Sequence, residues 1–215
     1  MPDYDSVATK QNQLIRKALQ GSVFVAPHTA DPIAALSDAT GLVALPTGYD
    51  DVGWTTDDGA QFSRDVSTSD VPAWGSVEPV RRDITSDVTT LQIACLETKK
   101  TTIGLYTGAD MSTVTADSTT GEVQVDKPDR PATRLYRVLS LAVDLGDAGE
   151  IYVARFLPRA SVTDFDTQSY TSGDTPVTWP VTMTGYNDSV EGYSERYIFG
   201  GPGWQALLTA AGFGA

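Results

Sequence analysis

Apolar and polar residues alternate with a period of two at several places in the chain, and this pattern predicts half-buried β-strands. Leu91, Ile93 and Cys95 fall on one side of an extended chain, with polar residues on the other. The sequence therefore predicts a strand here whose apolar side is buried. Cys95, the only cysteine, is expected to act as a small buried hydrophobic residue.

Two longer segments with the same alternation, 134–145 and 150–158, are separated by the Gly-containing residues 146–149. This spacing predicts a β-hairpin, because antiparallel strands are commonly joined by a short turn. Residues 177–186 also alternate, but Pro180 has no N–H to donate to a neighbouring strand. The strand that contains it is therefore expected to lie at a sheet edge or to carry a bulge.

Shorter elements complete the predicted fold. Strands are expected at 23–26, 42–45, 53–56, 60–66, 121–127 and 193–199, with 53–56 and 60–66 forming a hairpin around residues 57–59. Helices are expected at 98–107 and 204–211. Because strands do not alternate with long helices, we expect a mainly β, antiparallel sandwich or barrel-like fold with one or two short helices and a long extended loop.

The 215 residues are expected to form a single domain, 1–215, with three distinct segments. An N-terminal arm covers about residues 1–21, in which 5–20 form either a thin amphipathic helix or an arm that orders against a neighbour. Residues 28–52 show little periodicity and are expected to form a long loop. Such a loop is typical of a contact or functional element. The helix at about 204–211 forms the C-terminal segment.

The chain carries 15 Lys and Arg against 28 Asp and Glu, which gives a net charge of −13. This balance argues against binding to nucleic-acid phosphates, which depends on clusters of Lys and Arg. A single cysteine excludes an internal disulfide, and neither a signal peptide nor an apolar run of about 20 residues is present. We therefore expect a protein that is made and folds in a cytoplasm.

Residues that carry catalytic chemistry are scarce. His28 is the only histidine and no nucleophile motif accompanies it, and the chain lacks the several Cys or His ligands of a zinc site. Acidic residues adjoin one another at Asp50-Asp51, Asp57-Asp58 and Asp164-Phe165-Asp166. They suit calcium or a glycosidase pair, but turn chemistry explains them more simply. We expect no enzyme activity, no catalytic residue, no cofactor and no metal.

A central stretch, residues 72–98, combines turns with the alternating strand described above. It begins with Trp-Gly and Glu-Pro pairs, which favour turns and extended geometry. Arg81, Arg82 and Asp83 lie between these turns and the strand. Their spacing alone is typical of a solvated strand edge.

This stretch resembles the central signature of the major tail tube proteins of long-tailed (siphovirus-type) bacteriophages, most of all those of actinobacterial phages. The resemblance is carried by Trp74-Gly75-Ser76, Glu78-Pro79-Val80-Arg81, Asp83, the Thr-rich strand, Leu96-Glu97-Thr98, Asp57-Asp58-Gly59, Gly201-Pro202-Gly203-Trp204 and Gly212-Phe213. The likeness lies in the order and spacing of these pieces, which are spread over most of the chain.

The resemblance implies a structural virion protein whose β-sandwich subunits form hexameric rings. The rings stack into the tail tube through which DNA passes during ejection. As partners it implies further copies of the chain, a tape measure protein and a tail terminator protein, with no specific DNA binding and no membrane. Trp74, Arg81, Arg82 and Asp83 then become candidate contacts between subunits. At least one of the two arginines is expected to pair with an acid of another subunit.

Two further expectations follow from such an assembly. Neighbouring subunits should cover the edge strands and the 28–52 loop, so that removal of residues 30–48 leaves a folded monomer that does not assemble. The sheet that faces the lumen should carry more Asp and Glu than Lys and Arg, with Ser and Thr between them. A basic wall would instead bind DNA phosphates.

Two other function classes remain open at this point. The first is a non-catalytic β-sandwich binding module, such as a carbohydrate-binding domain or a capsid decoration protein. Trp54, Trp74, Trp179 and Trp204 could supply its aromatic contacts. The second is a β-sandwich hydrolase, for which the sequence offers no catalytic set.

Overall fold

The computed structural model describes residues 3–38, 41–130 and 132–214. Its main element is one antiparallel sheet with the strand order β4-β1-β7-β8-β9-β6-β5, in which β10 pairs with β8 outside this path. The main-sheet strands are β1 (Gln20–Pro27), β4 (Asp50–Asp51), β5 (Gln61–Val71), β6 (Arg81–Cys95), β7 (Tyr136–Gly146), β8 (Gly149–Phe165), β9 (Trp179–Gly185) and β10 (Arg196–Gly200). The mainly β, antiparallel fold expected from the sequence is confirmed.

Short elements accompany the sheet. They are the two-stranded pair β2 (Ser37–Asp38) and β3 (Gly41–Leu42), the helices α1 (Tyr4–Val7), α2 (Lys100–Thr107) and α3 (Pro202–Gln205), and the 3-10 helix η1 (Asn12–Leu14). Within the described residues, none of the helices has the length and apolar character needed to cross a membrane.

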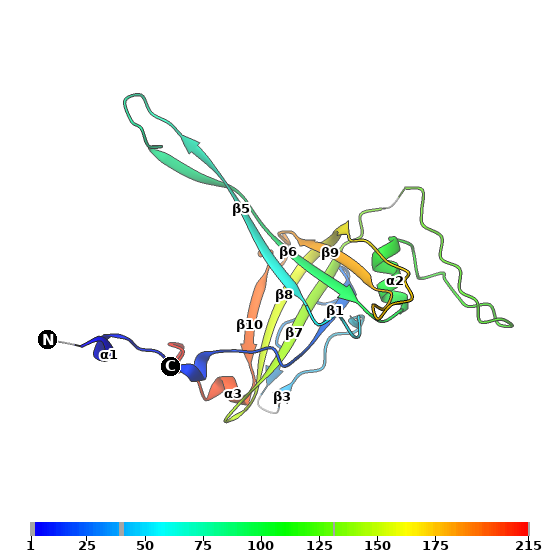
Figure 1. Ribbon diagram of the computed structural model, residues 1–215, viewed down its shortest axis with the longest axis horizontal. Coiled ribbons are helices and arrows are strands. Elements are labelled where there is room, and N and C mark those ends of the chain that lie inside the picture. The colour runs from blue at the N-terminus through cyan, green and yellow to red at the C-terminus, as the bar shows by residue number, and fades with distance from the viewer. Residues whose placement is uncertain (1–2, 39–40, 131, 215) are drawn as a thin grey trace.

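The long strand β8 organises the sheet, because it pairs with different partners along its length. It pairs with β7 from Gly149 to Ala160, with β10 over Tyr152–Phe156, and with β9 over Ala160–Phe165. The two ends of the sheet curl toward each other, and Thr55 bridges Cys95 at the far end of β6. The result is a barrel-like body (Figure 1).

The interior of this body is filled by side chains from strands at both ends of the sheet order. Leu91, Ile93 and Cys95 of β6 are buried, as the alternation predicts. They share one cluster with Val23, Val25, Val52, Leu105, Val138, Leu157, Ala160, Val181 and Met183. Burying each large apolar side chain contributes about 1.5–3 kcal/mol, so this cluster is the main source of fold stability.

A second apolar cluster lies on the opposite face of β7 and β8. Leu139 and Phe156 pack there against Ile33 and Leu36 of the segment expected as a free loop, and all four side chains are buried. Arg137 also donates a hydrogen bond to the carbonyl of Ala30 at 2.8 Å. Removing residues 30–48 would strip this cluster of its cover. The expectation that the deletion leaves a folded monomer therefore conflicts with the packing.

Helix α2 lies where the sequence predicted it and closes one end of the body. The side chain of Thr102 accepts a hydrogen bond from the N–H of Lys99 at 2.9 Å, which satisfies a donor near the helix start. Gly108 ends the helix with a φ of +67°, in the left-handed region that favours glycine. Between these ends, Leu105 enters the interior cluster.

Three predicted strand features differ from the structure. Residues 121–127 form no strand, because the segment 112–130 projects from the body (Figure 1) and, within the part of the chain that the structure describes, lies beside no strand with which it could pair. Residues 53–56 form only the bridge at Thr55, because Gly53 turns the chain with a φ of +83°. The partner of β5 is therefore β6. Between 42 and 45, strand pairing stops at Leu42.

The predicted C-terminal helix is shorter than expected, and Pro180 lies in an interior strand. After Gln205 the amide of Leu207 bonds to the carbonyl of Trp204, an i−3 pattern that does not extend the α-helix to residue 211. Strand β9 lies between β8 and β6, but its ladder to β8 stops at Val181. Pro180 therefore has a neighbouring strand, β6, on one side only. On its other side no strand lies beside it, and there its missing N–H is tolerated.

The N-terminal segment is an arm. Apart from α1 and η1, its described residues are extended, and Figure 1 shows it leaving the body on the side of α3. Its inner end is fixed where the N–H of Leu19 bonds to the carbonyl of Val143 and Arg16 pairs with Asp144 at 3.3 Å. The continuous helix expected as one alternative for residues 5–20 is not formed, and an arm that orders against a neighbour stays a prediction.

Candidate functional site

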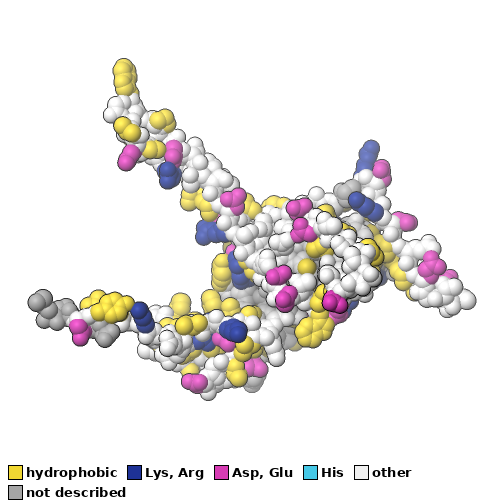
Figure 2. All heavy atoms as spheres, viewed as in Figure 1, with side chains coloured by type: hydrophobic (Ala, Val, Ile, Leu, Met, Phe, Trp, Pro, Cys, Tyr) yellow, Lys and Arg dark blue, Asp and Glu magenta, His cyan; other side chains and the backbone are white. Residues whose placement is uncertain are grey.

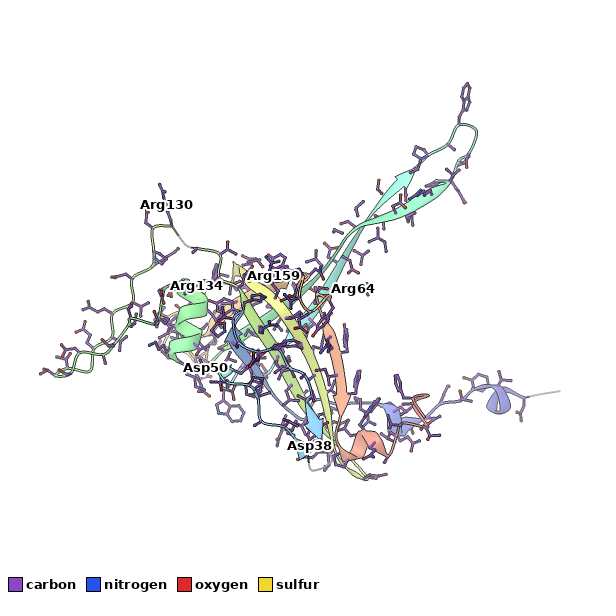
Figure 3. All side chains as sticks on the ribbon, turned by 180° about the vertical axis from the view of Figure 1, so that it is seen from behind. Asp38, Asp50, Arg64, Arg130, Arg134 and Arg159 are labelled. Atoms are coloured by element: carbon purple, nitrogen blue, oxygen red, sulfur yellow. The ribbon has the colours of Figure 1, made fainter. Side chains whose placement is uncertain are left out.

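The outer half of the β5–β6 hairpin projects well beyond the body, and Figure 3 shows it from behind with Arg64 at its base. Its register runs without interruption to Val71 and Arg81, apart from a bulge between Ser67 and Thr68. From Arg81 to Asp87 the strand extends roughly 20 Å, at about 3.3 Å per residue. The side chains of this half have no apolar core beneath them.

The base of the hairpin is fixed to the body by Arg155. Its guanidinium lies 3.7 Å from the ring centre of Phe62 on β5 and 4.7 Å from that of Tyr197 on β10. The same guanidinium pairs with Glu195, which also accepts a hydrogen bond from Thr89 of β6 at 3.1 Å. This half-buried network sets the direction in which the hairpin leaves the body.

The tip of the hairpin, residues 72–80, is exposed and mostly apolar, with Ser76 and Glu78 as its polar residues. Trp74 and Val77 are as exposed as in an extended peptide, at 106% and 103%. Gly75 allows the turn after Trp74 with a φ of +84°. Figure 2 shows hydrophobic side chains at the end of this projection, and Ile84 adds another on β6. A soluble monomer gains nothing from such a surface, which is typical of an interaction site.

The charged candidate residues Arg81, Arg82 and Asp83 lie just below the tip and pair within the chain. Arg82 makes two hydrogen bonds to the carboxylate of Asp70 across the hairpin, at 2.6 and 2.9 Å. Arg81 bonds to Asp83 at 2.8 Å. The hydrogen bond from Arg82 lowers the pKa of Asp70. Both guanidinium groups remain exposed and keep donors free for further acceptors.

The outward face of β5, β6, β9 and β8 is polar, and we call it the polar sheet face. Its polar members are Gln61, Ser63, Asp65, Thr90, Gln92, Ser161, Thr163, Asp164, Thr182, Thr184 and, just beyond β8, Asp166; its small apolar members are Val88, Ala94 and Pro180. These residues alternate with those of the interior cluster. The face as defined contains three acids and no Lys or Arg.

Register aligns the hydroxyl groups of this face in a row across four strands. Ser63 lies opposite Thr90, Thr90 opposite Thr184, and Thr184 opposite Ser161. The hydroxyls of Ser63 and Thr90 are 2.6 Å apart, and those of Thr163 and Thr184 are 2.7 Å apart. In the next row, Gln92 donates to Asp166 at 2.5 Å. Many of these side chains satisfy one another, and Ser161 is buried with its hydroxyl donating to Tyr186. The exposed part of the face is polar and weakly acidic.

The margin of this face carries one basic residue. Two positions before Ser161, the guanidinium of Arg159 donates to the carbonyl of Asn187 at 3.4 Å. Its charge therefore lies toward the 186–193 turn that follows β9. The arginines of the hairpin lie outside the face as defined: Arg64 lies on the opposite side of β5 and pairs with Asp87, and Arg81 and Arg82 lie near the tip.

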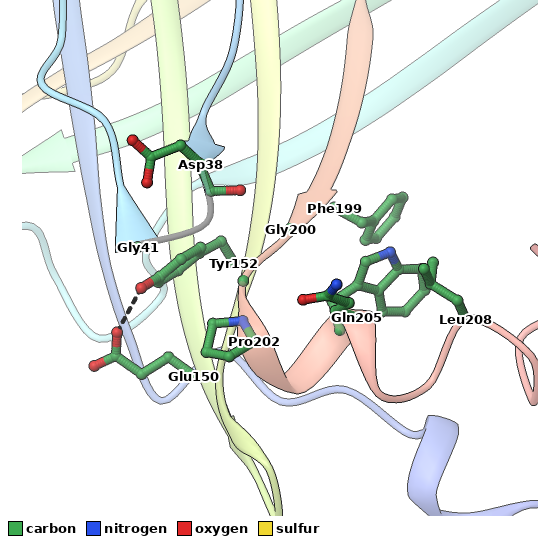
Figure 4. Close-up of a pocket in the computed structure, with 12 residues that line it drawn as sticks. Asp38, Gly41, Glu150, Tyr152, Phe199, Gly200, Pro202, Gln205 and Leu208 are labelled. Atoms are coloured by element: carbon green, nitrogen blue, oxygen red, sulfur yellow. Dashed lines mark hydrogen bonds between the residues drawn. The ribbon is translucent and has the colours of Figure 1, made fainter.

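A cavity of about 950 Å³ opens at the end of the body away from the hairpin, between α3, β10 and the β2–β3 pair (Figure 4). It is lined by Ser37, Asp38, Gly41, Glu150, Tyr152, Phe199, Gly200, Gly201, Pro202, Trp204, Gln205 and Leu208. Phe199 and Trp204 stack with ring centres 5.1 Å apart. Tyr152 donates to Glu150 at 2.7 Å. The cavity therefore combines an aromatic wall with an acidic rim.

His28 forms a structural tether. Its Nε2 lies 2.7 Å from the buried carboxylate of Asp188, which also accepts hydrogen bonds from the N–H groups of Val190 and Glu191. The contact with His28 is the largest cause that lowers the pKa of Asp188 to about 2. This pair ties the segment after β1 to the turn after β9.

The acidic pairs noted in the sequence have local structural partners. Asp51 accepts a hydrogen bond from the N–H of Gly53 at 2.8 Å, and Asp164 caps the N–H of Phe165. Across the described residues, no three His, Cys, Asp or Glu side chains come together in a way that would hold a metal ion. The contact of Asp51 agrees with turn chemistry, whereas Asp164 lies within strand β8 and not in a turn.

Trp74 and the charges at Arg81–Asp83 are recognisable from the sequence, but two features of the structure are not. The aromatic cavity joins residues from three distant segments, so no local pattern indicates it. The polar sheet face depends on cross-strand register, although the Thr-rich sequence of β6 and β9 was a signal for it. Trp179, one of the tryptophans considered for sugar binding, packs edge-on against Tyr106 at 5.6 Å, and Trp54 is exposed elsewhere.

Comparisons with known proteins identify the family. No curated protein sequence matches the chain. A solved structure described as the tail of an empty GTA particle, refined with C6 symmetry, is similar, with 9% sequence identity over 72% of this chain and 87% of that chain and a TM-score of 0.35. A family model described as phage tail tube protein matches residues 7–194, which is most of the chain. The chain therefore belongs to the phage tail tube protein family, whose members are structural components of the virion tail.

Proposed function

We propose that this chain is the repeating subunit of a phage tail tube, built from hexameric rings that stack around a channel for DNA. Family membership supports the structural role. The sequence resemblance to tube proteins of long-tailed actinobacterial phages supports the ring of six and the roles of a tape measure protein and a tail terminator protein as partners. In the structure, the polar sheet face is the feature that supports the proposal most directly.

This face has the properties that a DNA channel needs. Asp65, Asp164 and Asp166 repel phosphates over about a Debye length, 8–10 Å at moderate salt. The hydroxyl row that includes Ser63 and Thr90 supplies a surface whose hydrogen bonds are already partly satisfied within the chain. DNA that touches such a wall gains no counterion release and therefore slides without being held.

The sheet edge formed by β5 supports closure of a ring. β5 ends the strand order of the main sheet, so in the described chain one of its edges carries unpaired backbone groups. An edge strand of eleven residues is an aggregation hazard unless another chain covers it. Pairing with a neighbouring subunit would satisfy this edge and continue the polar sheet face around the channel.

Electron microscopy of the purified protein tests the proposal. We expect tubes with six-fold symmetry and the polar sheet face on the inner wall. A protein that remains monomeric at all concentrations, or a tube with this face outside, would contradict the proposal.

A charge substitution gives a second, functional readout. Tubes of the Thr184→Lys variant should retain double-stranded DNA fragments at low salt, whereas wild-type tubes should not. The matched control is Thr171→Lys, in an exposed loop away from this face. Equal DNA retention by both variants would show that the polar sheet face does not line the channel.

A further inference from the structure

The tip of the hairpin and the aromatic cavity lie at opposite ends of the molecule (Figures 1 and 4). We propose that Trp74 of one copy enters the Phe199–Trp204 cavity of a second copy, with Arg81 near the acidic rim. This inference rests on the proposed tube function and names the surfaces that join successive copies.

The exposed side chain of Trp74 and the aromatic cavity match in size and polarity. An aromatic side chain buries about 150–250 Å² and is a common anchor of protein interfaces. Trp74 is fully exposed at the end of a turn of small and apolar residues. A cavity of about 950 Å³ with a stacked Phe199–Trp204 wall has room for this ring and for its neighbour Val77.

Both the cavity and the hairpin carry charged residues. The cavity lining includes Asp38 and Glu150 and has no Lys or Arg among its twelve residues. The hairpin carries Arg81 and Arg82 just below the tip, exposed and paired with Asp83 and Asp70, and the tip itself carries one acid, Glu78. A tip that inserts with Trp74 first brings these cations toward the carboxylates of the rim. Arginine suits such pairing because it can bond to a carboxylate in a bidentate manner.

The positions of the hairpin tip and the cavity within one subunit favour a head-to-tail contact. A projection at one end that fits a cavity at the other end makes a head-to-tail contact, and such contacts repeat into open chains or tubes. The hairpin spans roughly 20 Å from Asp87 to Arg81, by the rise of an extended strand. It therefore reaches beyond the body of its own subunit. A second copy of this chain is the occupant that accounts for both surfaces at once.

Cysteine cross-linking tests the contact directly. In the double variant Val77→Cys and Gln205→Cys, mild oxidation of assembled protein should link copies into a ladder on a non-reducing gel. The native Cys95 is buried and its pKa is raised to about 12, so it does not compete. The control pair is Val77→Cys with Val123→Cys, which places the second thiol on the projecting 112–130 segment. A ladder from the control pair alone would overturn the proposal.

Truncation of the anchor gives an independent test. The Trp74→Ala variant should fold normally, because the side chain touches no core, but its critical concentration for tube assembly should rise at least about tenfold. Trp54→Ala, which removes another exposed tryptophan, is the matched control and should assemble like wild type. Normal tubes from Trp74→Ala would overturn this inference and leave the tube function intact. A wild-type protein that never forms tubes would overturn both.

The acidic rim is tested by charge reversal. Glu150→Lys should weaken assembly, and adding Arg81→Glu in the same chain should restore part of it. Asp147→Lys, an exposed acid three residues away that does not line the cavity, should assemble normally. Equal loss from the two lysine variants, without rescue, would contradict a role for the rim and favour a general charge effect.

Discussion

The two halves of strand β6 differ sharply although they belong to one continuous ladder. From Leu91 to Cys95 alternate side chains are buried, whereas from Arg81 to Asp87 nearly all are exposed. Backbone pairing to β5 continues through both halves. Pairing therefore sets the shape of the hairpin, but burial supplies the stability. A two-stranded ribbon is marginal alone in water, so the outer half depends on its continuity with the body and is free to receive a partner.

The largest expected contrast between the halves is thiol reactivity. Burial raises the pKa of Cys95 from 9.0 to about 12, which lowers its thiolate fraction at neutral pH by about a thousandfold. A cysteine placed on the outer half by Ile84→Cys should react with a thiol reagent as an exposed thiol does. Reaction rates measured on native protein, with unfolded protein as the reference, give the comparison. Fast labelling of native Cys95 would contradict the assigned burial.

Truncation in each half should separate stability from assembly. Leu91→Ala should lower the free energy of unfolding by about 2–5 kcal/mol, because it opens a cavity in the interior cluster. Ile84→Ala on the outer half should change it by less than about 0.5 kcal/mol. Urea denaturation of the monomers measures both. Comparable losses would mean that the outer half has its own core.

The tether between His28 and Asp188 is expected to contribute less to the free energy of unfolding than the side chain of Leu91 does. Asp188→Asn should cost about 1.5–3 kcal/mol, because it weakens the hydrogen bonds of a buried carboxylate to His28 and to two backbone N–H groups. The exposed Asp174→Asn is the matched control. Denaturation curves at neutral pH that coincide for the two variants would show that the tether adds no stability.

The same carboxylate defines a pH window. Its pKa in the folded protein, about 2, lies below the ordinary 3.8, so its contribution is fully present above about pH 4 and is lost as pH falls through about 2. The stability difference between wild type and Asp188→Asn should therefore shrink between pH 4 and pH 2. A difference that stays constant over this range would contradict the assigned pKa.

The smallest effect on monomer stability is expected at the outer pair. Arg82→Ala removes two hydrogen bonds to Asp70, but both groups are exposed and such pairs contribute little. Thermal unfolding of the monomer should be unchanged. Arg137→Ala, which removes a buried guanidinium bonded to the carbonyl of Ala30, is the contrasting variant and should destabilise clearly. A large loss from Arg82→Ala would mean that the outer half stabilises the fold.

The sequence determined the elements whose signals are local. The alternation around Leu91 and Ile93 marked a buried strand, the two long alternating segments marked the β7–β8 hairpin, and helix α2 lies within the predicted residues. Each of these depends on neighbours a few residues apart. Dependence on local signals also explains the predicted strands that do not form. Val123 and its neighbours have a strand-like pattern, but no partner strand lies beside them.

Tertiary structure alone decided the surfaces on which the proposals rest. The hydroxyl row exists because register places Ser63, Thr90 and Thr184 side by side, and a shift of one residue would turn each strand over. The cavity exists because α3 packs back on β8 near Tyr152. The segment around Ile33 and Leu36 has little period, yet both side chains are buried against the sheet. Contacts between distant segments carry no periodic signal, so only the folded chain reveals them.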